Sequence, residues 1–417
     1  MCAHTCACIS IMHAATFISW ILLILVIGGN YGKQQLPPVI LVPGDGGTRI
    51  EGKLSKPSHG PHITCTKVTK HYYTMWVRIF SVLTPTATDC FIANFRLIYN
   101  NKTHTTSYPD GVDIRVPGFG NTESVEWLTD IHISKKLVGY YAMIVHNMVK
   151  WGYVRNKTVR GAPYDFRKAP NEMSGYYLQL TKLIEETYTI NNNSKVVLLG
   201  HSLGNLVILY FLNKKPQEWK DKFIGSFVTL AAPWGGSVKT VKMQASGDDM
   251  NIATVKALRA RSVQRSMPSS AFLLPSDQFW NKTEVLIQAP TRNYTVGDYK
   301  QFFTDINFPD GYLMRKDTEN LVNPMKPPNV EVHCLYSYGL PTAKTLVYTK
   351  DEWPDKQPKP INEDGDHTVS LRSLEGCLRW KTLQKQPIYL KRFHGIKHLD
   401  MLKEDVVIDY IKSILVK

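Results

Sequence analysis

A serine bracketed by glycines separates a short apolar run from an amphipathic stretch near the middle of the chain. Residues 196–199 form a continuous apolar run typical of a buried strand, and apolar residues recur at helical spacing over 203–212. Between them, residues 200–204 read Gly-His-Ser-Leu-Gly, with Ser202 at the centre. Glycines two residues either side of a serine permit a sharp strand-to-helix turn that exposes the hydroxyl above a helix N-terminus. The pattern predicts a nucleophile elbow, and therefore a serine hydrolase or acyltransferase.

Strand-like and helix-like segments alternate around this turn. Apolar, strand-like runs occupy 36–43, 158–166, 227–230 and 330–336, and helical periodicity is present over 177–188 and 406–416. Apolar strands that alternate with helices are typical of a mostly parallel sheet with helices on both faces. The sequence therefore predicts an α/β-hydrolase fold, with a catalytic domain over residues 31–417 and insertions at 65–90 and about 237–324.

The N-terminal segment differs from the rest of the chain. No Lys, Arg, Asp or Glu precedes Lys33, and an apolar run over residues 14–27 ends at Gly28 and Gly29. Because this run is too short and too abruptly ended for a membrane span, residues 1–30 are predicted to be a signal peptide. The usual basic n-region is missing, so a retained N-terminal anchor stays open as an alternative.

Features of a luminal or secreted glycoprotein follow the leader. Five Asn-x-Ser/Thr sequons begin at Asn101, Asn156, Asn192, Asn281 and Asn293. The four cysteines that remain after the leader are Cys65, Cys90, Cys334 and Cys377. They suggest two disulfides, and the nearest-neighbour pairing closes the shortest loops of the three possible pairings. The net charge of +15 favours anionic phospholipid membranes as partners, whereas a secreted glycoprotein is not expected to bind nucleic acid.

A serine nucleophile needs a base and an acid that orients the base, and on this fold they follow the serine in the order acid, then histidine. The acid candidate is Asp366, with Asp364 as its rival, and the base candidate is His398, with His394 as its rival. Residue chemistry alone does not separate either pair. The oxyanion hole is expected to use the backbone N–H of Leu203 and an N–H from the Gly44–Gly47 loop, at Asp45.

Several longer sequence segments contain or flank these candidate residues. They are residues 42–45, 108–120, 160–167, 200–204 and 232–236, then Gly365-Asp366 with Thr368-Val369, and His398. Together they resemble the lysosomal phospholipase A2 and lecithin–cholesterol acyltransferase family over nearly everything after residue 36. The resemblance implies Ser202 as nucleophile, Asp366 as acid and His398 as base. It also implies an oxyanion hole from the amides of Asp45 and Leu203, and the disulfides Cys65–Cys90 and Cys334–Cys377.

The implied activity is that of a calcium-independent, phospholipase A2-like serine enzyme without cofactor or metal. It would cleave fatty-acyl esters of glycerophospholipids at membrane surfaces through an acyl-serine, and pass the acyl group to water or to a lipid alcohol such as ceramide. The chain stops nineteen residues after His398, which favours the lysosomal phospholipase branch. Open alternatives are a secreted phosphatidylcholine–sterol acyltransferase, a non-catalytic lipid-binding protein on a hydrolase fold, and a general esterase or peptidase.

Two positions depart from the family pattern. Family members usually carry a bulky residue after the oxyanion-loop aspartate, where Gly46 stands here, so we expect a looser loop and a lower rate. The residue after the triad aspartate is usually glycine, and here it is His367. Because that position needs a permissive backbone, we expect local strain at His367.

An apolar stripe lies between Cys65 and Cys90. Its members, at helical spacing, are Tyr72, Met75, Trp76, Ile79, Phe80 and Leu83. Lys70 and Arg78 flank the stripe, as cationic residues flank an interfacial helix. The family resemblance makes this segment the membrane-docking element. Residues 237–270 are rich in Lys and Arg, and are interpreted as a mobile lid or a static cap.

Overall fold

The computed structural model describes residues 36–78, 84–129, 138–250 and 255–416. Pro37–Lys417 belong to one structural unit and Met1–Leu36 to another. The predicted signal peptide, residues 1–30, lies outside the described residues. In the described ranges no helix combines the length and apolar character that crossing a bilayer requires.

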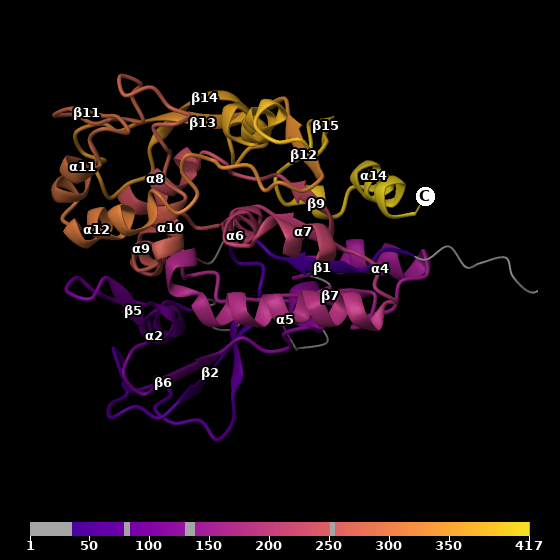
Figure 1. Ribbon diagram of the computed structural model, residues 1–417. Coiled ribbons are helices and arrows are strands. Elements are labelled where there is room, and N and C mark those ends of the chain that lie inside the picture. The colour runs from indigo at the N-terminus through magenta and orange to yellow at the C-terminus, as the bar shows by residue number, and fades with distance from the viewer. Residues whose placement is uncertain (1–35, 79–83, 130–137, 251–254, 417) are drawn as a thin grey trace, which may run out of the picture. The chain divides into compact units, whose positions relative to one another are not determined.

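A six-stranded sheet forms the centre of the larger unit (Figure 1). In spatial order its strands are β15 (Ile388–His394), β12 (Val332–Tyr338), β9 (Ile224–Leu230), β8 (Val196–His201), β1 (Val39–Val42) and β7 (Val159–Gly161). Each of its strand pairings is parallel. Strands of a parallel sheet are covered on both faces and so read as continuous apolar runs, and β1 and β8 are buried along their whole length. The predicted α/β-hydrolase fold is confirmed.

Helices connect and surround these strands. The α-helices are α3 (Glu123–Glu126), α4 (Ala142–Lys150), α5 (Ser174–Ile190), α6 (Leu203–Asn213), α7 (Gln217–Phe223), α13 (Leu371–Leu374) and α14 (Asp405–Leu415). Short 3₁₀ turns occur at Pro170–Glu172, Glu375–Thr382 and Asp400–Leu402. The predicted helices over 177–188, 203–212 and 406–416 correspond to α5, α6 and α14. Helix α6 contacts both β8 and β1, which fixes the residue that precedes it.

A first excursion leaves the sheet after β1. Its elements are β2 (Ile50–Leu54), β3 (Tyr73–Trp76), α2 (Pro85–Phe95), β4 (Ile98–Asn100), β5 (Thr105–Ser107) and β6 (Val112–Arg115). Strand β2 pairs antiparallel with both β3 and β6, and β4 pairs with β5. The Cys65–Cys90 disulfide ties the segment before β3 to α2. We call residues 50–115 the docking excursion.

The helix predicted for the apolar stripe of this excursion is wrong at its start. Residues Tyr73–Trp76 form strand β3, in which Ile50 pairs with Trp76. Pairing with β2 satisfies the backbone of this segment, and that tertiary contact overrides the helical spacing of its apolar residues. Met75 is buried at 2% exposure, so it does not face solvent. Tyr72 and Trp76 are half-buried. Three further members of the stripe, Ile79, Phe80 and Leu83, lie outside the described residues.

A second region, drawn at the upper left of Figure 1, lies apart from β2, β5 and β6 of the first excursion. Its elements are α8 (Val238–Ala245), α9 (Ala257–Arg265), α10 (Pro268–Phe272), β10 (Ile287–Gln288), β11 (Asn293–Tyr294), α11 (Tyr299–Asp305), α12 (Pro309–Thr318), β13 (Leu340–Val347) and β14 (Lys359–Gly365). One buried cluster, which includes Trp280, Phe302 and Leu346, joins these helices to β13. The helices of this region, with β10 and β11, lie within residues 237–324, which we call the cap segment.

The cationic residues of α9 are engaged with the rest of the protein. Arg259 donates to the Asp89 carboxylate and to the Pro85 carbonyl of the docking excursion. Arg261 donates to Asp355 and to the Ala245 carbonyl. Arg265 donates to the Gln244 carbonyl. These contacts hold α9 against its neighbours. They give the three arginines of α9 partners within the protein.

The strand order brings distant loops to one edge of the sheet. Because parallel neighbours end at the same edge, the loop after β1 and the turn after β8 lie side by side. The β12–β15 pairing brings the loop after β15 towards the same edge. The Cys334–Cys377 disulfide ties β12 to the segment that follows α13. Both disulfides therefore have the predicted pairing.

Candidate active site

Ser202 occupies a strained backbone turn between β8 and α6. Its φ of 53° and ψ of −128° lie in a region that residues with a side chain rarely adopt. A Cβ at Gly200 would lie 2.4 Å from Asn205 Oδ1, and one at Gly204 would lie 2.4 Å from the Val42 oxygen. The two glycines are therefore required by space. The Ser202 N–H donates to the Leu230 carbonyl at the end of β9, which anchors the turn.

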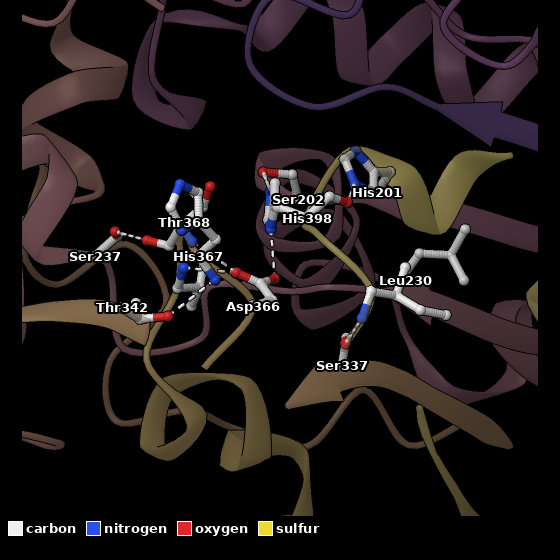
Figure 2. A network of polar contacts seen from close by, with 12 residues as sticks. His201, Ser202, Leu230, Ser237, Ser337, Thr342, Asp366, His367, Thr368 and His398 are labelled. Atoms are coloured by element: carbon white, nitrogen blue, oxygen red, sulfur yellow. Dashed lines mark hydrogen bonds and ion pairs between the residues drawn. The ribbon is translucent and has the colours of Figure 1, made fainter. Parts of the chain in front are cut away.

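A serine, a histidine and an aspartate meet at this turn (Figure 2). His398 Nε2 lies 2.9 Å from Ser202 Oγ, and His398 Nδ1 lies 2.6 Å from Asp366 Oδ2. Asp366 is fully buried and His398 is nearly so. The other Asp366 oxygen accepts from the amides of Thr368 and Val369. These donors fix the carboxylate so that its remaining oxygen faces the imidazole.

The rival residues lie at a different place, the connection between β12 and β13. The Gly339 N–H donates to Asp364, and the His394 ring lies where a Cβ of Gly339 would be. His394 also packs edge-on against Tyr338. Of the two carboxylates and two histidines that residue chemistry left open, Asp366 and His398 are the ones in contact with Ser202 or with each other.

The predicted oxyanion loop is a tight turn pressed against the elbow. The Gly47 N–H donates to the Gly44 carbonyl at 3.0 Å. A Cβ at Gly44 would lie 2.7 Å from the Ser202 Cβ, so the turn that carries Asp45 lies directly beside the serine. Leu203 is the first residue of α6, and its N–H is at the positive end of the helix dipole. The turn and the N-terminus of α6, which carry the predicted donors Asp45 and Leu203, therefore both lie next to Ser202.

The carboxyl group of Asp45 is desolvated. Burial raises the pKa of Asp45 to about 6, although Lys239 and the Gly46 amide favour its charged form. Its Oδ1 is buried and lacks a hydrogen-bond partner among the described residues. The Asp45 carboxyl is therefore mostly neutral below about pH 6 and mostly charged above it.

Comparisons with known proteins show the family to which the chain belongs. A family model described as "Lecithin:cholesterol acyltransferase" matches residues 71–405. The chain belongs to the lecithin:cholesterol acyltransferase family. A Rattus norvegicus protein named "Lysosomal phospholipase A and acyltransferase" is 44% identical over 99% of this chain and 99% of its own length. The Homo sapiens protein of that name is 46% identical over 95% and 94%. A Mus musculus "Phosphatidylcholine-sterol acyltransferase" is 41% identical over 95% and 90%.

Membership in the lecithin:cholesterol acyltransferase family makes this chain an enzyme, a serine hydrolase and acyltransferase.

At the first departure from the family pattern, Gly46, a neighbouring aromatic ring contacts the loop. The Trp76 indole N–H donates to the Gly46 carbonyl at 2.7 Å, and a Cβ at Gly46 would lie 3.3 Å from the Trp76 ring. Gly46 also has a φ of +71°, which a side chain would strain. Instead of a bulky residue in the loop, this chain packs a ring from the docking excursion against it.

Two aromatic residues, Trp76 and Tyr140, contact the predicted oxyanion turn at Gly44–Gly47, and the sequence did not predict these contacts. The sequence predicts Trp76 as part of the membrane-docking stripe, but its side chain is half-buried. Its ring stacks on that of Phe95, with 5.8 Å between centroids, and meets the Phe166 ring edge-on, with 5.5 Å between centroids. Tyr140 was not assigned at all, although its hydroxyl accepts from the Gly44 N–H. Neither residue lies in a motif that involves the serine, so only the folded arrangement reveals them.

The second departure from the family pattern, His367, carries the expected strain. Its φ is 76°, in the left-handed region. Its N–H donates to Thr342 Oγ1 at 2.9 Å, which holds the residue next to Asp366 in this conformation. The His367 side chain is exposed and contacts the Pro341 carbonyl through Nδ1 at 3.2 Å.

Replacing His367 with glycine should stabilise the protein. Glycine adopts a positive φ without the steric cost that histidine bears, so His367→Gly should raise the free energy of unfolding by roughly 1 kcal/mol. Thermal unfolding would measure this, and kcat on a soluble ester should stay within twofold. A fall in the melting temperature would mean that the His367 side chain contributes more than its backbone costs.

Trp76→Phe should slow hydrolysis of a soluble short-chain ester. The phenyl ring keeps part of the packing but cannot donate to Gly46, so the oxyanion turn loses one of its anchors. We expect a several-fold loss in kcat, below the roughly hundredfold cost of deleting an oxyanion donor. The matched control is Ile63→Ser, because Ile63 belongs to the same excursion and is 84% exposed. Equal rates for Trp76→Phe and Ile63→Ser would show that Trp76 does not support the turn.

The raised pKa of Asp45 predicts a pH-dependent stability difference. Because the folded state holds the proton more tightly than the unfolded state, ionisation weakens the wild-type fold as pH rises from about 4 to about 6. The uncharged amide of an Asp45→Asn variant would carry no such cost. The melting temperature of Asp45→Asn relative to wild type should therefore increase between about pH 4.5 and about pH 7, and parallel melting curves would contradict it.

Proposed function

We propose that Ser202 is the nucleophile, His398 the general base and Asp366 the acid that orients it. The observation that carries this proposal is the continuous contact from Ser202 Oγ through His398 to Asp366, at 2.9 and 2.6 Å. The proposed oxyanion donors are the backbone N–H groups of Asp45 and Leu203.

The contacts define the protonation states that the reaction needs. Asp366 accepts from Nδ1 of His398, so the neutral ring carries its proton there and presents a lone pair at Nε2. Nε2 takes the Ser202 proton as Oγ attacks the ester carbonyl. The resulting oxyanion receives the two backbone N–H groups, and His398 then returns the proton to the departing alcohol. An acyl-Ser202 remains, and the same steps in reverse order transfer the acyl group to an acceptor.

The proposed donor is a glycerophospholipid and the proposed acceptors are water and a lipid alcohol such as ceramide. The printed names of the rat and human relatives, phospholipase A and acyltransferase, support both half-reactions. The alternative acceptor is a sterol, as in the name of the mouse relative at 41% identity. No calcium is used in these steps, because serine, histidine and backbone amides supply every role.

The proposed residence is the lysosomal lumen or the extracellular space, reached through a cleaved signal peptide at 1–30. The word "lysosomal" in the relatives' names supports the first. The asparagines of all five sequons are exposed, so each can carry a glycan: Asn101, Asn156, Asn192, Asn281 and Asn293. Two disulfides also suit an oxidising compartment.

The proposed docking surface lies on the excursion stapled by Cys65–Cys90. Ile63 and Val68, on either side of Cys65, are 84% and 62% exposed. Lys67 and Lys70 lie close by in sequence, and the whole chain carries +15. Exposed apolar side chains with cationic neighbours support adsorption to anionic phospholipid surfaces. The predicted membrane-binding stripe consists of Tyr72, Met75, Trp76, Ile79, Phe80 and Leu83. We propose that it contributes to lipid binding without Met75, which is buried.

Ser202→Ala should abolish both hydrolysis and acyl transfer. Without the nucleophile, turnover of phospholipid in mixed liposomes should fall more than about a thousandfold. The matched control is Ser262→Ala, which removes an exposed hydroxyl from α9 and should leave turnover unchanged. Product analysis with ceramide and cholesterol both present identifies the acceptor. Acylated ceramide supports the proposal, cholesteryl ester supports the alternative, and undiminished turnover in Ser202→Ala contradicts both.

A further inference from the structure

One run of hydrogen bonds joins the oxyanion turn, the elbow and the loop of the catalytic histidine. The Gly44 N–H donates to the Tyr140 hydroxyl at 3.0 Å. That hydroxyl lies 2.5 Å from His201 Nδ1, and His201 Nε2 lies 3.1 Å from the backbone oxygen of His398. Tyr140 and His201 are 8% and 0% exposed, so each depends on these partners for its polar atoms.

Chemistry fixes the direction of every bond in this run. A carbonyl only accepts, so His201 must carry its proton on Nε2 to reach His398. A neutral imidazole has one N–H, so His201 Nδ1 accepts and the Tyr140 O–H donates to it. The Tyr140 oxygen is then free to accept from the Gly44 N–H, which only donates. With His201 neutral, each hydrogen bond in the run therefore has one donor and one acceptor.

The surroundings of His201 keep it neutral. Burial, followed by the nearby His398, lowers the pKa of His201 well below its usual range. The two histidine rings lie 5.0 Å apart (Figure 2). A second positive charge beside a protonated His398 would be costly, which disfavours protonation of His201 during the reaction as well.

Each end of the run holds a part of the catalytic centre. A Cβ at Gly47 would lie 2.5 Å from the Tyr140 ring, and a Cβ at Gly44 would lie 2.8 Å from the Tyr140 hydroxyl. Tyr140 therefore spans both ends of the oxyanion turn. At the other end, the His398 backbone is held on both sides, because its N–H donates to the Asp366 carbonyl and its carbonyl accepts from His201.

We propose that Tyr140 and His201 are positioning residues that keep the oxyanion turn, Ser202 and His398 in one fixed arrangement. The inference rests on the proposed roles of Ser202, His398 and Asp45. Neither side chain touches substrate: Tyr140 acts through the turn that carries Asp45, and His201 acts through the backbone of His398. Their loss should lower kcat, because catalysis depends on small displacements of these groups, and should leave KM unchanged.

The first experiment compares two tyrosine hydroxyls. Tyr140→Phe should lower kcat on a soluble short-chain ester on the order of tenfold, a fraction of the effect of deleting an oxyanion donor, with KM within twofold. Labelling of Ser202 by a fluorophosphonate should slow in parallel. The matched control is Tyr153→Phe, since Tyr153 is 2% exposed and donates to the Pro37 carbonyl at 2.9 Å, at the start of the same segment as β1.

Tyr153→Phe should lose comparable stability and keep its kcat. If Tyr140→Phe also keeps kcat within twofold, or if Tyr153→Phe loses as much, the proposal is overturned. If Tyr140→Phe does not fold, His201→Gln provides the same comparison. Its amide N–H can still reach the His398 carbonyl, so we expect a smaller loss than for His201→Phe.

A double-mutant cycle tests whether the two residues act through each other. Tyr140→Phe and His201→Gln each break the Tyr140–His201 bond, so the double variant should lose less than the product of the two single losses. Multiplicative losses would overturn the relay. Ser202→Ala serves as the reference: if it stayed active, the proposed function would fail, whereas an inactive Ser202→Ala with a fully active Tyr140→Phe would reject the relay alone.

Discussion

The structure depends on one strained residue. Ser202 adopts a backbone conformation that is unfavourable for any side chain, and the rest of the centre is what keeps it there. Two glycines give it space, an N–H bond to Leu230 anchors it, and the turn after β1 closes against it. The turn holds the Ser202 hydroxyl in one orientation. His398, 196 residues later in the chain, contacts it in that orientation.

The sheet converts sequence distance into contact. Ser202, Asp366 and His398 follow β8, β14 and β15 respectively, and the loop with Asp45 follows β1. Because β1 and β8 are neighbours and parallel, their ends meet at one edge. The short separation of Asp366 and His398, 32 residues, is spanned by α13, a 3₁₀ segment and β15. The Cys334–Cys377 disulfide joins β12 to this connection and restricts it further.

Much of this arrangement can be predicted from sequence, because its signals are local. The buried runs of β1, β8 and β9, the glycines of the elbow and the periodicity of α5, α6 and α14 all lie within short windows. The choice between Asp364 and Asp366 could not be made locally, since the two carboxylates are two residues apart at a strand end. Only the family resemblance separated them, and the hydrogen bonds now show that Asp366 faces His398.

The failures share a physical cause, which is pairing between remote segments. The spacing from Tyr72 onward suits one face of a helix, but β2 offers the backbone of Tyr73–Trp76 a partner, and the strand forms instead. Tyr140 has no motif because its role comes from its position over Gly44 and Gly47, nearly a hundred residues earlier in the chain. Likewise, the serine motif allows any residue at the position of His201, so the motif does not predict that its two ring nitrogens contact Tyr140 and His398.

The indole of Trp76 has a consequence for how variants of this enzyme are interpreted. The strand that carries it belongs to the stapled excursion, while its N–H ends on the turn beside the nucleophile. Under the proposed docking of this excursion on lipid, a shift of β3 would also displace the turn beside Ser202, because Trp76 is bonded to it. A substitution in the excursion that slows turnover on vesicles would then report on the geometry at Ser202 as well as on affinity for the bilayer.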